Sequence, residues 1–214
     1  MSGHRRRRAL GLAAVACLAM TAACSDKPGT ASSVPATAPD SFRVAVETTR
    51  GTFVVEAIRS WAPNGTDRFY ALARAGFFDD NRFFRVVPGF VAQFGINTEK
   101  KVNEHWDDTP FPDDPPHGTN SRGTIVFTSQ GPATRSHQMF VNLGDNARLD
   151  RQGFVPFGRV VEGMAVVDSI YSGYGEAPVQ QLIQTLGNSY LVRMFPKLDY
   201  IKSLKIVTAG NGTQ

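Results

Sequence analysis

The chain has 214 residues, of which 42% are hydrophobic, so it can bury one sizeable core, and it contains no repeat of fixed period. Four of its 23 Lys and Arg residues lie at positions 5 to 8, and the other 19 equal the 19 Asp and Glu residues. A chain that is close to neutral beyond its first residues has no basic face to release counterions from phosphates, which excludes nucleic acid as a partner.

The first 23 residues have the pattern of an export signal. Arginines precede an apolar run from Ala9 to Ala23, about 15 residues long and shorter than the roughly 20 that span a bilayer. We therefore predict that residues 1–23 direct export and are removed. Arg7 and Arg8 also allow a twin-arginine signal, which we place below the ordinary export route.

A cysteine follows the apolar run directly. Thr21-Ala22-Ala23-Cys24 resembles the lipobox of bacterial lipoproteins, in which the cysteine is lipidated and becomes the mature N-terminus. Thr21 stands where Leu is usual, and ordinary cleavage after Ala23 is the alternative. Cys17 is the only other cysteine, so the folded part has none to cross-link. We expect an exported protein of the periplasm or outer cell envelope, anchored to the membrane by a lipid on Cys24.

Beyond the leader, the composition separates a linker from a folded domain. Residues 24–41 are small, polar and proline-bearing, which predicts a disordered linker. The folded domain is expected over residues 42–214.

The domain begins with a hairpin and a helix. Apolar and polar residues alternate on both sides of Thr49-Arg50-Gly51, which predicts a hairpin over 42–58. A helix follows over 62–76, with Asn64 or Thr66 as its N-cap and Gly76 at its C-terminal end.

Strands dominate the rest of the domain. Residues 83–95, FFRVVPGFVAQFG, predict two short strands joined at Pro88-Gly89, and residues 97–122 are turn-rich and acidic. The remaining predicted elements are three strands, a helix, a stretch of helical turns and a closing strand, at 123–129, 138–143, 154–161, 161–171, 182–195 and 198–209. Short, closely spaced strands are typical of an antiparallel sheet or barrel.

Four motifs, in order along the chain, are similar to those of the cyclophilins, which are peptidyl-prolyl isomerases. They are APNGTDRFYALARAGFFD at 62–79, FFRVVPGFVAQFG at 83–95, GTIVFTSQGPATRSHQMFVNL at 123–143 and LDRQGFVPFGRVVEGMAVVD at 149–168. The resemblance covers about residues 42–171. It implies a mainly β fold, an eight-stranded antiparallel cyclophilin-like barrel capped by two α-helices, with a substrate groove on its outside.

The resemblance also assigns residues to this groove. Arg85 falls on the family's catalytic arginine, and Gln93 falls on the glutamine that helps to hold it. The other groove positions are a proline pocket at Phe90, Val91, Phe140 and Leu149, a further contact at Gln138, a short peptide-pairing strand at Thr128, Ser129 and Gln130, and Phe154, about where the family often has histidine.

These residue types suit rotation about the bond before proline. The peptide bond resists rotation by ~18 to 20 kcal/mol because the nitrogen lone pair is shared with the carbonyl. A half-rotated bond has lost that sharing, so a donor aimed at its nitrogen inside an apolar pocket favours the twisted state. Arg85 is permanently charged, and an amide such as Gln93 can fix its plane. Such catalysis requires neither a cofactor nor a metal.

The residues also allow other interpretations. A non-catalytic peptide-binding module or surface adhesin on the same fold is the alternative to an isomerase, and in either case the expected partners are proline-containing segments of client proteins, bound by a monomer. His105, His117 and His137 lack paired ligand spacing, so no metal site is expected. Asp107-Asp108 and Asp113-Asp114 are most simply a solvated turn.

Besides Phe154, the sequence departs from the family pattern at three places. Arg148 stands where many cyclophilins have a tryptophan that contributes to cyclosporin binding, so the resemblance predicts weak inhibition by cyclosporin. Ser129 replaces a common asparagine. Residues 172–197 are longer than the family core needs, and the sequence assigns them no function.

Overall fold

A computed structural model describes residues 37–207, so the expected export signal, Cys24 and most of the expected linker lie outside the described residues. The strands are β1 (Ser41–Thr48), β2 (Gly51–Ile58), β3 (Arg85–Val87), β4 (Val91–Phe94), β5 (Thr124–Phe127), β6 (Met139–Asn142), β7 (Pro156–Glu162) and β8 (Ile201–Val207). The helices are α1 (Pro63–Arg74), α2 (Lys100–Asp107), α3 (Met164–Asp168), α4 (Gln180–Leu186) and α5 (Asn188–Met194), with a 3₁₀-helix at Ala147–Gln152.

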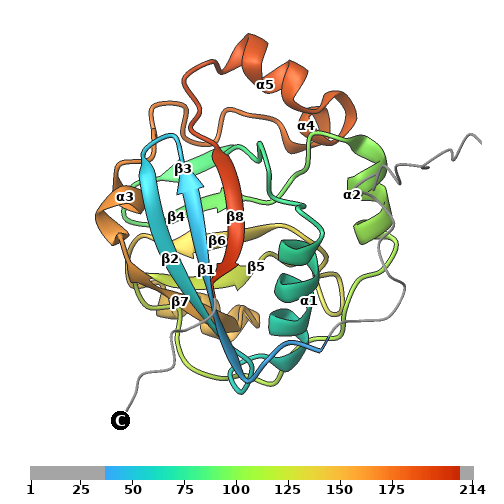
Figure 1. The fold of residues 1–214 in the computed structure, drawn as a ribbon, viewed down its shortest axis with the longest axis vertical. Coiled ribbons are helices and arrows are strands. Elements are labelled where there is room, and N and C mark those ends of the chain that lie inside the picture. The colour runs from blue at the N-terminus through green and yellow to red at the C-terminus, as the bar shows by residue number, and fades with distance from the viewer. Residues whose placement is uncertain (1–36, 208–214) are drawn as a thin grey trace, which may run out of the picture. The chain divides into compact units, whose positions relative to one another are not determined.

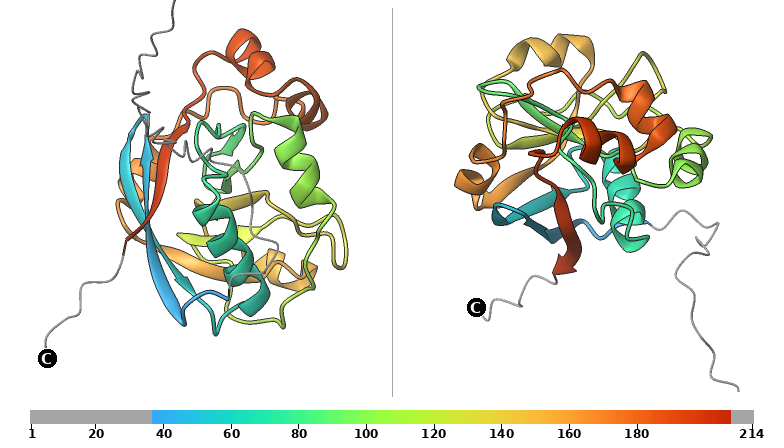
Figure 2. Two further views of the ribbon diagram at one scale, coloured as in Figure 1. Left: turned by 45° about the vertical axis from the view of Figure 1, so that its right-hand side comes forward. Right: turned by 90° about the horizontal axis from the view of Figure 1, so that it is seen from above.

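The eight strands form one curled antiparallel sheet in the order β3-β4-β6-β5-β7-β2-β1-β8 (Figures 1 and 2). Its two edge strands are β3 and β8. Backbone hydrogen bonds join the residues just before β3 to the start of β8: Phe83 N–H donates to Asp199 O at 3.0 Å, and Ile201 N–H to Asn81 O at 2.8 Å. The expected mainly β fold with eight antiparallel strands is confirmed.

The predicted hairpin is the β1–β2 pair, which turns at residues 49 and 50. Apolar and polar residues alternate along both strands, and the apolar ones face the core. Val44, Val46, Phe53 and Val55 are at most 2% exposed. The ordered domain also begins earlier than expected. Ala38 is buried, and its N–H donates to Asp67 Oδ1 at 2.9 Å, so residues 38–41, assigned to the linker by composition, belong to the fold.

Helix α1 packs against β2, β7 and β8 and contributes Phe69 and Leu72 to the core (Figure 1). Its N-cap is Ala62, so the prediction of Asn64 or Thr66 was wrong. Pro63 begins the helix, where its missing N–H costs nothing.

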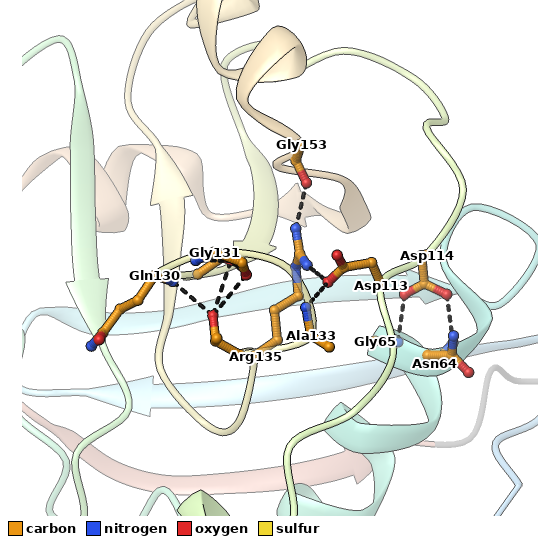
Figure 3. A network of polar contacts seen from close by, with 11 residues as sticks. Asn64, Gly65, Asp113, Asp114, Gln130, Gly131, Ala133, Arg135 and Gly153 are labelled. Atoms are coloured by element: carbon orange, nitrogen blue, oxygen red, sulfur yellow. Dashed lines mark hydrogen bonds and ion pairs between the residues drawn. The ribbon is translucent and has the colours of Figure 1, made fainter.

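An aspartate from elsewhere in the chain takes over the capping of α1. Asp114 accepts hydrogen bonds from the backbone N–H groups of Asn64 and Gly65, both at 2.8 Å (Figure 3). Burial raises the pKa of the Asp114 carboxyl above its ordinary value, against the effect of the two N–H donors. Asp114 is only 8% exposed, so the expectation of a solvated turn there was wrong.

The other helices differ from the expected pattern. Helix α3 is shorter than the helix predicted over 161–171, because Gly163 before it adopts a left-handed conformation with φ of 77°. Helices α4 and α5 occupy the stretch of predicted helical turns and lie together, with α2 against α4 (Figure 1). Helix α2 was missed in the turn-rich segment. Between residues 37 and 207, no helix is long and apolar enough to cross a membrane.

Asp199, which is 6% exposed, ties three distant segments together just before β8. It accepts hydrogen bonds from Thr49 Oγ1 at 2.6 Å, from Arg50 Nε at 2.7 Å and from the Tyr171 N–H at 2.7 Å. Burial opposes the charge on Asp199, but the donors from Thr49, Arg50 and Tyr171 outweigh it and lower the pKa of this carboxyl.

Because the folded pKa lies below the unfolded value of about 4, Asp199 stabilises the fold above that pH and loses its contribution as the pH falls through the folded pKa. We expect Asp199→Asn to lower the free energy of unfolding by about 1 to 3 kcal/mol at pH 7. Urea unfolding should show a smaller difference at pH 3, and exposed Asp79→Asn is the control. An equal loss at both pH values would contradict this assignment.

Candidate active site

One groove of about 420 Å³ on the outer face of the sheet collects every residue that the sequence predicted for the site. These residues are Arg85, Phe90, Val91, Gln93, Thr128, Ser129, Gln130, Gln138, Phe140, Leu149 and Phe154. Gln152 and Gln180 also line the groove, and sequence reasoning missed both.

The register of four adjacent strands places the central residues side by side. Arg85 on β3 is paired with Gln93 on β4, Gln93 with Phe140 on β6, and Phe140 with Val126 on β5. Directly paired residues point to the same face of a sheet, whereas their chain neighbours point to the other. Neighbours such as Ala92 and Val141 accordingly belong to the main core. A shift of one residue in any of these pairings would remove a side chain from the groove.

Arg85 is held by a chain of polar contacts. Its Nη1 donates to Gln93 Oε1 at 3.3 Å, and Gln93 Nε2 donates to Gln138 Oε1 at 3.2 Å. The two glutamines are 5% and 9% exposed, whereas the Arg85 side chain is 26% exposed. The guanidinium carbon lies 5.4 Å from the centre of the Phe90 ring. The cation is therefore oriented by buried amides while one side stays open to the groove.

An apolar wall stands beside this cation. Val91, Val126, Phe140 and Leu149 form a small buried cluster separate from the main core, with Phe90 and Phe154 packed against it. The rings of Phe140 and Phe154 meet edge-on with their centres 5.8 Å apart. A wall of this kind accepts a compact apolar ring, such as that of proline, without a polar partner.

Residues 128–130 form the far side of the groove, but they are not a strand, so the expected short strand was wrong. Thr128 N–H still donates to Gln138 O at 2.9 Å. After it, Gln130 N–H bonds Thr134 Oγ1 at 2.9 Å. These local bonds hold residues 128–130 in a loop that lines the groove.

Arg135 connects the loop that follows β5 to two other segments of the chain. Its guanidinium bonds Asp113 and the backbone oxygen of Gly153, so it joins the loop to the segment that carries Phe154 (Figure 3). Asp113 also accepts the Ala133 N–H at 3.0 Å. Burial lowers the pKa of Arg135, which is 6% exposed. Asp113, although itself exposed, therefore fastens one side of the groove.

The neighbouring His137 is completely buried. Its Nδ1 lies 2.5 Å from Gly95 O, and its Nε2 lies 2.9 Å from Asp107 Oδ1. Burial opposes the charge on Asp107, but His137 and a hydrogen bond from Ser136 lower its pKa. His137 thus anchors the backbone next to Gln138. In residues 37–207 no group of three His, Cys, Asp or Glu side chains could hold a metal ion.

Two further charged residues, Arg148 and Glu176, contact residues of the groove. The Arg148 guanidinium carbon lies 4.7 Å from the centre of the Phe90 ring, so this arginine contacts the same ring as Arg85. Weak inhibition by cyclosporin stays a prediction. Glu176, in the segment to which no function was assigned, contacts Arg85 directly.

Comparisons with known proteins agree with this geometry. Residues 43–187 match the family model "Cyclophilin type peptidyl-prolyl cis-trans isomerase/CLD". A "Peptidyl-prolyl cis-trans isomerase" of Acinetobacter baylyi is 30% identical over 133 residues, covering 59% of this chain and 70% of the relative. "Peptidyl-prolyl cis-trans isomerase B" of Escherichia coli is 31% identical over 136 residues, covering 59% and 82%. The chain therefore belongs to the cyclophilin-type peptidyl-prolyl cis-trans isomerase family, and its activity is that of a peptidyl-prolyl cis-trans isomerase.

A solved structure shares the fold. The crystal structure of a Cryptosporidium parvum cyclophilin-type isomerase superimposes with a TM-score of 0.58 at 19% identity, covering 79% of this chain and 99% of the other. A second structure of that protein was determined in the presence of the dipeptide Ala-Pro.

The position of Gln93 generates a kinetic prediction. Gln93→Leu keeps the approximate volume but removes the bond that fixes Arg85, so we expect kcat to fall about 3- to 10-fold with little change in KM. Turnover of a short Xaa-Pro peptide measures this. Gln181→Leu, at an exposed position of α4, is the matched control. A large rise in KM with unchanged kcat would assign Gln93 to substrate binding alone.

Proposed function

We propose that the groove is the isomerase active site and that Arg85 is its catalytic donor. The observation that carries the proposal is the pairing of an oriented guanidinium with an apolar wall, within one groove and across four adjacent strands. The Ala-Pro dipeptide present with the Cryptosporidium relative supports a proline-containing peptide as the occupant.

In this proposal the proline ring lies against Phe140 and Leu149, and the chain before it runs past Thr128. The apolar wall excludes water from the proline nitrogen. As the bond twists, the nitrogen regains its lone pair and becomes an acceptor for an N–H of Arg85. A planar amide offers no such acceptor. The interaction therefore stabilises the twisted state more than either planar isomer, and no covalent intermediate is needed.

The required lowering of the rotation barrier is larger than one hydrogen bond can provide, so several interactions must contribute. Uncatalysed isomerisation takes tens to hundreds of seconds, so ~10³ turnovers per second would require about 10⁵-fold, or roughly 7 kcal/mol. One charge-assisted hydrogen bond contributes about 1.5 to 3 kcal/mol of this. The remainder would come from desolvation at the wall and from holding the flanking peptide in a twisted geometry.

We propose further that the protein is exported, anchored through a lipid on Cys24, and assists the folding of envelope or secreted proteins. The leader supports this, because its basic start, short apolar run and small residues before the cysteine fit an export signal. The linker up to residue 37 would give the domain reach from a membrane surface.

The role of Arg85 is tested by Arg85→Ala. We expect kcat to fall about 10- to 150-fold, which is the range for loss of one charge-assisted hydrogen bond, with a much smaller effect on peptide affinity. A protease-coupled assay on a proline tetrapeptide gives the rate, and titration calorimetry gives the affinity. Arg74→Ala, at the exposed end of α1, is the control. A parent protein that binds the peptide without turnover would instead be a non-catalytic binding module.

The anchor is tested separately. In a bacterial host that processes lipoproteins, mass analysis of the mature chain should show an acylated N-terminal Cys24. Cys24→Ser should leave the protein without acyl chains and shift it from the membrane to the soluble fraction. A mature N-terminus that follows Ala23 and carries no lipid would contradict the proposal.

A further inference from the structure

The segment from Ser172 to Leu198 is fastened to the barrel beside the groove. Its Ile183, Leu191 and Leu198 form a second apolar cluster with Phe84, which directly precedes Arg85, and with Ile96. The backbone joins it as well, because Val86 N–H of β3 donates to Gly175 O at 3.2 Å. This attachment fixes the turn that carries Glu176 against the strand that carries Arg85.

Glu176 and Gln93 contact different nitrogen atoms of the Arg85 guanidinium. Its Oε1 accepts from Arg85 Nε at 2.6 Å and lies 2.5 Å from Nη2, whereas Gln93 takes Nη1. Arginine has five N–H donors, so three are engaged and one remains on each of Nη1 and Nη2. A planar group held on two edges keeps little freedom to rotate.

We infer that Glu176 is a positioning residue of the active site, which orients Arg85 toward the bound peptide and offsets its charge. This inference rests on the proposed role of Arg85 in catalysis. The two guanidinium groups of Arg85 and Arg148 approach the same Phe90 ring, at 5.4 and 4.7 Å. A carboxylate on Arg85 weakens the repulsion between them and keeps Arg85 in one place.

The solvent exposure of the Arg85–Glu176 ion pair distinguishes a role in turnover from a role in the stability of the fold. The Glu176 side chain is 62% exposed, and exposed ion pairs contribute little to the stability of a fold. Loss of the carboxylate should therefore leave the unfolding midpoint unchanged and act on turnover. Because solvent reaches the pair, added salt should weaken it.

The test compares Glu176→Gln and Glu176→Asp with the parent full-length chain. Glu176→Gln should lower kcat about 3- to 10-fold with KM unchanged, and Glu176→Asp, which keeps the charge, should recover part of the loss. Raising the salt from 0.05 to 0.5 M should lower kcat of the parent toward that of Glu176→Gln while barely affecting the variant. Glu162→Gln, at an exposed glutamate of β7 paired with Arg43 at 3.7 Å, is the matched control.

Two results would overturn the inference. Unchanged kcat and an unchanged salt response in Glu176→Gln would show that the contact has no role in turnover. A higher kcat in Glu176→Gln would show that the carboxylate competes with the peptide for Arg85. A parent chain without isomerase activity would refute the proposed function itself, and it is thus distinguishable from both. The Arg85 Nε–H signal in ¹⁵N spectra reports directly whether the ion pair forms in each protein.

Discussion

The site depends on one constraint, which is that a permanent cation must be kept next to an apolar surface in one orientation and without free hydration. Arg85 meets it because its partners approach from the edges of the guanidinium, and the Phe90 ring lies against it. Beneath it, the buried amide of Gln93 donates in turn to Gln138 Oε1, so the group that orients Arg85 is itself held by a buried partner. Full solvation would weaken the donor, and complete burial of an unpaired guanidinium would cost more than the fold can supply.

The scaffold holds this arrangement through links that lie outside the groove. Arg135 joins the loop after β5 to the segment before β7, and His137 holds the entry to β6 against Gly95 and Asp107. Each of these groups is buried, and each connects chain segments that are far apart in sequence. The side walls of the groove are thereby fixed by the interior of the domain as well as by the contacts among the groove residues themselves.

Local patterns in the sequence predicted most of the strands, and the resemblance to the cyclophilins assigned the groove residues apart from Gln152 and Gln180. Alternation marked β1 and β2, and the motif around Arg85 and Gln93 placed both residues on paired strands. What failed depends on contacts across the chain. The cap of α1 comes from Asp114, about fifty residues away, and helix α2 shows only Val102 and Trp106 as apolar markers. Glu176 lies in a stretch without any motif, and only the folded chain brings it to Arg85.

The bond between Val86 and Gly175 has a consequence beyond catalysis. Strand β3 is an edge of the sheet, and an uncovered edge offers free N–H and C=O groups to any other extended chain. An isomerase that acts on proline-containing peptides encounters such chains. The turn at residues 172–177 lies along this edge, so a client in the groove cannot readily add itself to the sheet as a ninth strand and become trapped. The same turn thus also protects the barrel from self-association.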